Sequence, residues 1–481
     1  MIGNLPALMD SAVALVGALR RREVRSVEVT RAFLDRIAKG DHRIRCVTRP
    51  EPDSALRQAA DADRLADAGG PLGPLHGLPM TIKDGFPVAG SRSTFGLPHL
   101  RFYRPASDCE AVARLRRAGA VFLGRTAVPF ACFDWQCKPP LGRACVNPLD
   151  PTRTPGGSSG GAAAALAAGF TPLELGTDVA GSIRYPAHCC GVYGLRTTSG
   201  LIPAGDVGPD GGPVMPSAYA VGPMARSADD LALLLSALAP EPDPRTPAPP
   251  PGKPRVAVTR SVAGLPVDPQ TAAAIESVIQ RARAAGHEVV ETDPPFNFDE
   301  AYALWGLLVG YEMRASLPFV LRNRLGIRAF AAWFLFWRLG NGPLSVSIRR
   351  GLPASEAEYR DGLARRDELI ARVDRFLVDH PLWILPTSPM PAIPRQRSGR
   401  PIRFEGADVP YSRFLGGYLC PTIPMGTPAA VVPVTPPGGG LPVGVQVHAR
   451  RFADHWLVRV LGEWLPDGAA EPGAAPDPAG L

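Results

Sequence analysis

Short apolar segments alternate with helix-forming segments along this chain, and this alternation is what most restricts its fold. Residues 255–259 have the apolar pattern of a strand, residues 268–285 that of a helix followed by Gly286, and residues 287–291 that of a second strand. A strand, a helix and a strand in this order are typical of parallel pairing within one sheet. We therefore predict an α/β fold.

Helical spacing of apolar residues recurs elsewhere in the chain. Residues 10–38 predict two amphipathic helices separated near residues 22–26, with Gly40 as a C-cap. Ser227 and Asp230 form a Ser-x-x-Asp start signal for a helix over 228–238. Further helices are predicted at 54–68, 109–118 and 162–168, strands at 120–123 and before Lys83, and a mixture of strands and loops at 172–200.

The composition is that of a globular protein with a large core. Of the 481 residues, 45% are hydrophobic and 20% are charged, and the 51 glycines and 55 prolines follow no Gly-x-y period. The longest apolar run is far shorter than the roughly 20 residues of a membrane span. The net charge is +7, and almost all of the positively charged residues are arginines, which are scattered along the chain rather than clustered. This distribution argues against nucleic-acid binding.

Segments of unusual composition indicate how the chain is organised. Residues 240–254 are proline-rich and form a linker or a surface excursion, and residues 467–481 are predicted to be a disordered tail. The N-terminus lacks the pattern of a signal peptide and the eight cysteines are an ordinary number, so we predict a cytoplasmic protein with reduced thiols. The spacing of Cys132, Cys137 and Cys145 is not a common zinc spacing, and no metal site is predicted.

Three segments carry the residues of a serine–lysine hydrolase. An apolar run ends at Lys83, residues 155–161 read PGGSSGG before an alanine-rich segment, and residues 175–187 contain a second glycine–serine turn. A buried lysine loses its proton easily and can act as a base. A serine needs such a base to become a nucleophile, and a glycine-rich turn leaves backbone N–H groups to face an oxyanion.

Other interpretations of the glycine–serine segment fit less well. An isolated copy is typical of a flexible linker, and a phosphate-binding loop would end in Gly-Lys-Ser/Thr, which is absent here. Residues 157–161 also match Gly-x-Ser-x-Gly with Ser159 as nucleophile, but that motif requires a preceding strand. The prolines at 148, 151 and 155 exclude a central strand there.

Taken together, these segments resemble the amidase signature family of Ser–cisSer–Lys amide hydrolases. The resemblance rests on Gly-Gly-Ser-Ser-Gly-Gly, on Gly-Ser-Ile-Arg 24 residues later, on Leu-Pro-x-x-Ile-Lys-Asp, on residues 222–227 and on residues 440–446. It implies a large mixed central β-sheet covered by helices on both faces. It also implies a single amidase signature domain over residues 1–466, with a variable substrate-pocket region at about 296–380.

The resemblance assigns roles to individual residues. Ser182 would be the acylated nucleophile, Ser158 would pass a proton between Ser182 and the base, and neutral Lys83 would be that base. No metal or organic cofactor is implied, and the reaction would be hydrolysis of the carbon–nitrogen bond of a linear amide. The oxyanion would be bound by the backbone N–H groups of Val179, Ala180, Gly181 and Ser182. Support would come from hydrogen bonds of Ser159 and Thr177 and from pairing of Asp178 with Arg184.

The sequence departs from the family pattern at three places. Ala180 stands where many members have glycine, residues 195–198 read Leu-Arg-Thr-Thr instead of a Lys-Pro-Thr ending, and Cys189 replaces an aromatic residue. None of these changes removes Lys83 or the two serines. The change at Cys189 would at most widen a pocket wall.

The substrate is less constrained than the reaction. Residues 329–337 form an apolar, aromatic run that fits a buried helix, an apolar pocket wall or a membrane-surface contact. We expect a small-molecule acyl or aryl amide with an apolar group. Two alternatives remain, an acyl transferase that forms amides through the same acyl-enzyme, and the glutaminase subunit of a tRNA-dependent amidotransferase. Tyr185 stands where the latter branch usually has glutamine. The resemblance is also compatible with a homodimer.

Overall fold

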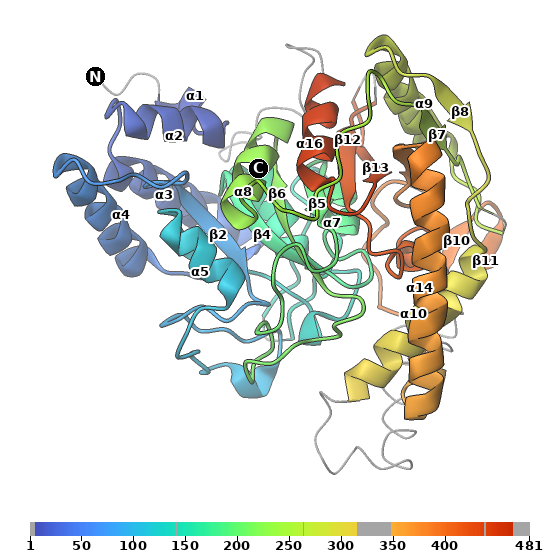
Figure 1. Ribbon diagram of the computed structural model, residues 1–481. Helices are drawn as coiled ribbons and strands as arrows, with labels where there is room; N and C mark the ends of the chain where they lie inside the picture. The colour runs from blue at the N-terminus through green and yellow to red at the C-terminus, as the bar shows by residue number, and fades with distance from the viewer. Residues whose placement is uncertain (1–4, 141, 263, 315–347, 437–438, 465–481) are drawn as a thin grey trace.

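A mixed β-sheet runs through the computed structural model, which describes residues 5–140, 142–262, 264–314, 348–436 and 439–464 (Figure 1). In the described part of the chain the sheet has 11 strands in the order β1-β3-β2-β4-β6-β5-β12-β13-β9-β7-β8. Pairing is parallel around β2 and around β7, and antiparallel elsewhere in this sheet. The strands are β1 (Val47–Pro50), β2 (Pro79–Lys83), β3 (Val121–Thr126), β4 (Leu173–Asp178), β5 (Tyr193–Arg196), β6 (Ala220–Ala225), β7 (Val256–Val258), β8 (Val289–Glu291), β9 (Leu382–Pro386), β12 (Ala429–Val434) and β13 (Val443–Ala449), with a separate hairpin of β10 (Ile402–Phe404) and β11 (Ala407–Val409).

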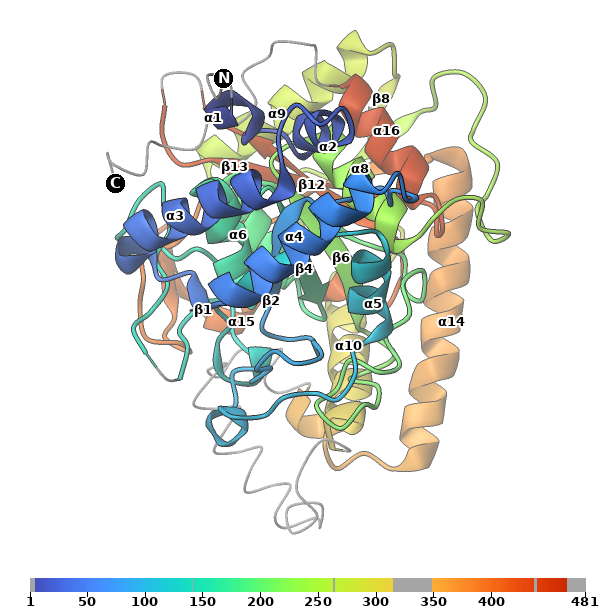
Figure 2. The ribbon, with the colours of Figure 1, turned by 90° about the vertical axis from the view of Figure 1, so that its left-hand side faces the viewer.

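Helices cover both faces of the sheet, and Figures 1 and 2 show them from two directions. Helices α8, α9 and α16 pack on one face, while α6 and α7 pack on the other. Helices α10 and α14 pack on each other. The helices are α1 (Leu5–Leu8), α2 (Ala12–Arg20), α3 (Ser26–Ile44), α4 (Pro52–Asp67), α5 (Glu110–Arg117), α6 (Gly160–Ala167), α7 (Arg184–Cys190), α8 (Ala228–Leu238), α9 (Pro269–Ala284), α10 (Phe298–Met313), α14 (Glu356–Asp379), α15 (Tyr411–Gly416) and α16 (Asp454–Glu463).

Alternate residues of the central strands enter different parts of the core. Ala430 and Val432 of β12 belong to the cluster that contains the buried faces of α8, α9 and α16. Val431 between them belongs to the cluster that contains Ile183 and the buried residues of α7. Because side chains along a strand point to opposite faces, both faces of this sheet are buried. The predicted fold class, a large mixed sheet covered on both faces, is confirmed.

Several local predictions agree with the structure. The predicted break near residues 22–26 separates α2 from α3, and the segment from β7 through α9 to β8 ends in a parallel strand pair. Ser227 caps α8 by accepting a hydrogen bond from the Asp230 N–H at 3.1 Å. The side chain of Asp230 makes no hydrogen bond to Ser227. It accepts from the Val13 N–H at 2.9 Å, and so joins α8 to α2.

Two local predictions were wrong. Gly40 is not a C-cap, because α3 continues to Ile44 and ends at Arg45 in the left-handed conformation. Gly40 lies on the buried stripe of this helix with Phe33, Ile37 and Ile44, so the apolar pattern continues past it. Helix α7 lies inside the segment predicted to hold only strands and loops. All seven of its residues are buried, so it lacks the amphipathic pattern that reveals surface helices.

The remaining predictions concern the connections. The proline-rich segment 240–254 has no helix or strand and joins α8 to β7, which is a strand of the same 11-stranded sheet. The aromatic run 329–337 and the predicted tail 467–481 lie outside the described residues. Among the residues that are described, no helix combines the length and hydropathy needed to cross a membrane.

Candidate active site

Lys83 is the last residue of β2, and its side chain is wholly buried. Its Nζ lies 2.8 Å from Ser158 Oγ and 2.6 Å from Thr177 Oγ1, and it donates a longer bond of 3.4 Å to Thr177 O. Burial lowers the pKa of Lys83 from its ordinary value of 10.5, although the thiol of Cys132 and the carboxylate of Asp178 act in the opposite direction. Burial therefore makes the neutral amine, the form that can accept a proton, easier to reach than it is in water.

Ser158 lies in a packed turn just before α6. The Gly157–Ser158 peptide bond is cis, and Ser158 is 1% exposed. A Cβ on Gly157 would lie 2.5 Å from Asp134 O, so only glycine allows this approach of the two backbones. The glycine–serine segment is thus a rigid part of the core, not the flexible linker that an isolated copy would suggest.

Ser182 lies in the turn between β4 and α7, beside the Ser158 segment. The Ser159 N–H donates to Ser182 O at 3.1 Å, which joins the two segments through their backbones. Ser182 is 9% exposed, whereas Ser158 and Ser159 are at most 1% exposed. Within the described part of the chain, no hydrogen bond joins the hydroxyls of Ser158 and Ser182. Hydrogen bonds of catalytic groups are often long in proteins without substrate and shorten during the reaction.

The turn at residues 179–182 presents backbone N–H groups unequally. Gly181 has φ of 93°, and a Cβ there would lie 2.3 Å from Leu419 Cδ1, so the turn requires glycine. The Gly181 N–H, one of the predicted oxyanion donors, donates to Asp178 Oδ1 at 2.8 Å and so already has an acceptor. No bond from the N–H groups of Val179, Ala180 or Ser182 to another described residue is found. Ala180 is not among the residues of positive φ, so its Cβ causes no backbone strain.

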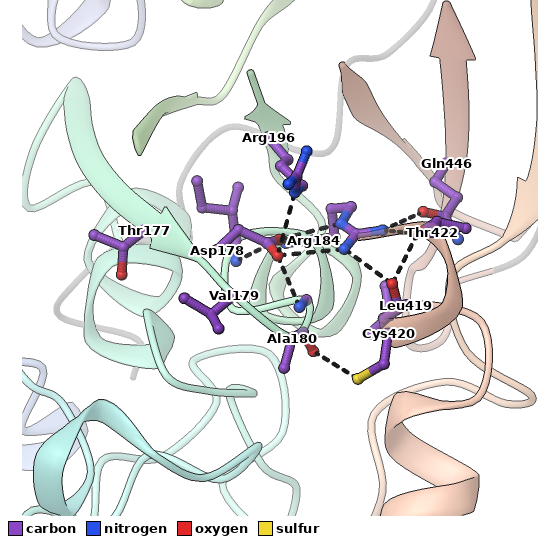
Figure 3. Close-up of polar contacts among 12 residues, drawn as sticks. Thr177, Asp178, Val179, Ala180, Arg184, Arg196, Leu419, Cys420, Thr422 and Gln446 are labelled. Carbon is purple, nitrogen blue, oxygen red and sulfur yellow. Dashed lines mark hydrogen bonds and ion pairs between the residues drawn. The ribbon is translucent and has the colours of Figure 1, made fainter. Parts of the chain in front are cut away.

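Asp178 and Arg184 form a buried ion pair behind this turn (Figure 3). Arg184 Nε lies 3.1 Å from Asp178 Oδ2 and Arg184 Nη2 lies 3.2 Å from Oδ1, and both side chains are fully buried. Burial alone would raise the pKa of Asp178, but the guanidinium groups of Arg184 and Arg196 lower it to about 2. The structure therefore pairs the two residues as the sequence analysis expected, and it keeps the carboxylate charged.

Arg184 also reaches the C-terminal part of the chain. Its Nη1 donates to Thr422 Oγ1 at 2.8 Å and to Gln446 Oε1 at 2.9 Å, and its Nη2 donates to Leu419 O at 3.2 Å (Figure 3). Arg196 Nε lies 4.0 Å from Asp178 Oδ1. Arg196 lies in the unusual segment 195–198, for which the sequence indicated no partner. The contact of Arg184 with Thr422 was not predicted, because a contact across more than 230 positions leaves no local pattern in the sequence.

The other residues singled out from the sequence differ in the contacts that they make. The Ser159 hydroxyl has no hydrogen-bond partner in the part of the chain that the structure describes, so Ser159 contributes through its backbone N–H. Cys189 is fully buried in α7 and lines no open wall. Thr177, by contrast, contacts Lys83 directly. Cys137 and Cys145 are buried and Cys132 is partly buried, and the described residues include no group of three or more His, Cys, Asp or Glu side chains arranged for a metal ion.

The chain is similar to known proteins over most of its length. Residues 28–458 match the family described as Amidase. The chain is 32% identical to an indoleacetamide hydrolase of Bradyrhizobium diazoefficiens over 464 residues, which cover 93% of this chain and 84% of that protein. It is 33% identical to one subunit of the glutamyl-tRNA(Gln) amidotransferase of Chloroflexus aurantiacus over 492 residues, which cover 94% of this chain and 97% of that protein.

A solved structure is similar over almost the whole chain. It comes from a study of a vestigial protein complex and the origins of an s-triazine catabolic enzyme, and it has a TM-score of 0.80 at 26% identity, covering 95% of this chain and 98% of that one. The chain belongs to the amidase signature family, whose enzymes hydrolyse amides, and its fold is the amidase signature fold.

Replacing Asp178 tests the buried ion pair. Asp178→Asn leaves two buried guanidinium groups without their counter-charge, so the free energy of unfolding in urea is expected to fall by about 3–5 kcal/mol at neutral pH. Because the pKa of Asp178 is lowered to about 2 from 3.8, the difference between the two proteins is expected to shrink as the pH falls toward 2.

Glu356→Gln is the matched control, because it breaks an exposed pair with Arg360 and should change stability little. Equal stability of the Asp178→Asn and Glu356→Gln proteins would contradict the prediction.

Proposed function

We propose that this chain is an amide hydrolase in which Ser182 attacks the amide carbonyl, Ser158 relays protons and Lys83 is the base. The observation that carries the proposal is the contact of 2.8 Å between the buried Lys83 amine and Ser158 Oγ. Only a neutral amine can accept a proton from a hydroxyl, and a lowered pKa makes the neutral form easier to reach. The backbone contact between Ser159 and Ser182 supports the placement of the nucleophile beside this pair.

The proposed reaction proceeds through an acyl-enzyme. Ser182 Oγ bonds to the carbonyl carbon while its proton passes to Ser158, and the Ser158 proton passes to Lys83. The oxyanion accepts hydrogen bonds from the N–H groups of Val179 and Ala180, with Ser182 N–H as a further donor. The proton then returns through Ser158 to the leaving amine as the carbon–nitrogen bond breaks. Water hydrolyses the ester by the same relay, so that amide and water give carboxylic acid and amine.

We propose a linear acyl or aryl amide with an apolar group as the substrate. Partly buried apolar side chains gather with those of the turn in one cluster, and they offer surface to such a group. The indoleacetamide hydrolase supports the same substrate class, because its named substrate carries an aromatic ring on a simple amide. The cluster's partly buried members are Phe130, Phe133, Val179, Ala180, Met215, Met390 and Val409.

A second candidate function is release of ammonia from glutamine. It is favoured by the identity of 33% to the glutamyl-tRNA(Gln) amidotransferase chain, over a match that covers 94% of this chain. This function would require partner proteins for transfer of the ammonia. Transfer of the acyl group to an amine instead of water uses the same acyl-enzyme and remains an alternative outcome.

Labelling by a fluorophosphonate tests the nucleophile. Ser182 Oγ is expected to form a bond to phosphorus and release fluoride, and peptide mass spectrometry should place the adduct on Ser182. Ser182→Ala should abolish the adduct, and Lys83→Ala should slow its formation on the order of 10²–10⁴-fold because the base is lost. Lys253→Ala, which removes an exposed lysine paired with Glu463, should label normally. An adduct on Ser159 would refute the assignment.

Substrate comparison tests the substrate class. Indole-3-acetamide and anilides are expected to be hydrolysed at least about tenfold more efficiently in kcat/KM than glutamine or acetamide, because the apolar cluster binds the larger group. Products are measured with and without added hydroxylamine, which reveals acyl transfer as a hydroxamate. Faster release of ammonia from glutamine would favour the amidotransferase function.

The pH dependence tests the role of Lys83. Activity requires the neutral amine, so kcat/KM is expected to rise with pH as Lys83 loses its proton and then to level off. Burial lowers the pKa of Lys83, so the midpoint of this rise should lie below pH 10.5, even though Cys132, Asp178 and Glu174 act in the opposite direction. The residual activity of Lys83→Ala should lack this rise. A midpoint at or above pH 10.5 would show that burial does not tune this lysine.

A further inference from the structure

Two tryptophan side chains donate hydrogen bonds to the back of the turn that holds Ser182. Trp305 Nε1 donates to Val179 O and Trp135 Nε1 donates to Ala180 O, each at 2.9 Å. Trp305 is 2% exposed and Trp135 is 4% exposed, so both donor side chains are buried, while the acceptor residues Val179 and Ala180 are partly buried. They come from distant parts of the chain, α10 and the segment before the glycine–serine turn.

The bond from Trp305 fixes the direction of one N–H group. In a trans peptide the C=O of one residue and the N–H of the next point in opposite directions within one plane. The peptide between Val179 and Ala180 is trans, so the indole that holds Val179 O also orients the Ala180 N–H. In the described part of the chain Trp305 is the one donor to Val179 O, and the Ala180 N–H has no acceptor.

The next peptide is held at both ends. Ala180 O accepts from Trp135 and has a weak contact of 3.9 Å with Cys420 Sγ, and the Gly181 N–H donates to Asp178 Oδ1 (Figure 3). Its N–H is therefore already used. The peptide between Val179 and Ala180 differs, because its C=O accepts a hydrogen bond from Trp305 while its N–H group has no acceptor among the described residues.

The two tryptophans are themselves fixed by packing. The residue before Trp135, Asp134, accepts a hydrogen bond of 2.6 Å from Tyr411 OH, and the rings of Trp135 and Tyr411 meet edge to face at 6.0 Å. Trp305 lies in the same core cluster as Ile183, the residue that follows Ser182 in the sequence. Both indoles are therefore held within one buried cluster of side chains.

We propose that Trp305 is a positioning residue that orients the Ala180 N–H as an oxyanion donor, and that Trp135 secures the adjoining peptide. The inference rests on the proposed acyl-enzyme function and adds residues that act behind the oxyanion site. A hydrogen bond accepted by a carbonyl also polarises the same peptide and strengthens its N–H as a donor. Trp305 thus contributes to the transition state without contact with substrate.

The test compares three substitutions that each remove one indole N–H and keep an aromatic ring. Trp305→Phe and Trp135→Phe remove the two donors to the turn. Trp383→Phe is the matched control, because Trp383 Nε1 bonds Thr259 Oγ1 at 3.0 Å in the separate cluster around β9. The rate of labelling by an aryl fluorophosphonate is measured against its concentration, which separates initial affinity from the maximal rate constant of the covalent step.

Trp305→Phe is expected to lower the maximal rate constant about tenfold at unchanged initial affinity, since only the transition state uses the oriented N–H. Trp135→Phe should lower it less, because Asp178 still holds the neighbouring peptide, and Trp383→Phe should leave it unchanged. Equal losses in all three proteins, or a loss of affinity alone in Trp305→Phe, would overturn the proposal.

Hydrogen exchange of the backbone amides at residues 179–182 gives a readout that does not depend on activity. Loss of one hydrogen bond to the turn should speed exchange of the Gly181 amide, whose N–H is bonded to Asp178, about fivefold in Trp305→Phe and leave it unchanged in Trp383→Phe. Unlabelled wild-type protein would overturn the proposed function, and the exchange rates would still decide the positioning role. Equal exchange in Trp305→Phe and Trp383→Phe would overturn that role.

Discussion

Burial of the Lys83 amine is the constraint on which the site depends. Water would hold this amine in its charged form, and a charged amine cannot accept a proton. The fold removes water by placing β2 between the parallel strands β3 and β4, so that the residue at its end is enclosed by neighbours. The two hydroxyls within 2.8 Å, from Thr177 and Ser158, then satisfy the amine without an adjacent carboxylate bonded to it. A lysine paired with a carboxylate would stay protonated.

The ion pair behind the turn joins segments that are far apart in the sequence. Asp178 ends β4, Arg184 begins α7, and the acceptors of the second guanidinium face come from residues 419–446. Removing two charges from water costs free energy, so the pair need not stabilise the fold. Its effect here is to fix the angle between β4 and α7, because the two side chains make bidentate contacts. The turn that carries Ser182 lies between these two residues, so its ends are held at a set separation.

The sequence allowed prediction of some features of this site better than others. The contact between Lys83 and Ser158 could be expected from the sequence, because an apolar run ends at Lys83 and the glycine–serine segment resembles a known family motif. Helix α7 was not predictable, since a fully buried helix shows no polar face. The engagement of the Gly181 N–H by Asp178 was not predictable either, because it depends on the turn's three-dimensional path. The contact of Trp305 spans 126 positions, and nothing near that residue in the sequence indicates its partner.

These contacts also answer an electrostatic difficulty in the proposed reaction. The Asp178 carboxylate lies directly behind the turn at which a negative oxyanion would form, and two like charges in a site of low dielectric constant repel strongly. The guanidinium groups of Arg184 and Arg196 neutralise Asp178 from the far side. In the proposed relay Ser158 takes the proton of Ser182 and passes its own proton to Lys83, so the oxyanion forms together with a nearby cation. Charge separation within the buried site is therefore balanced, and the oriented N–H groups stabilise the oxyanion rather than offset a repulsion.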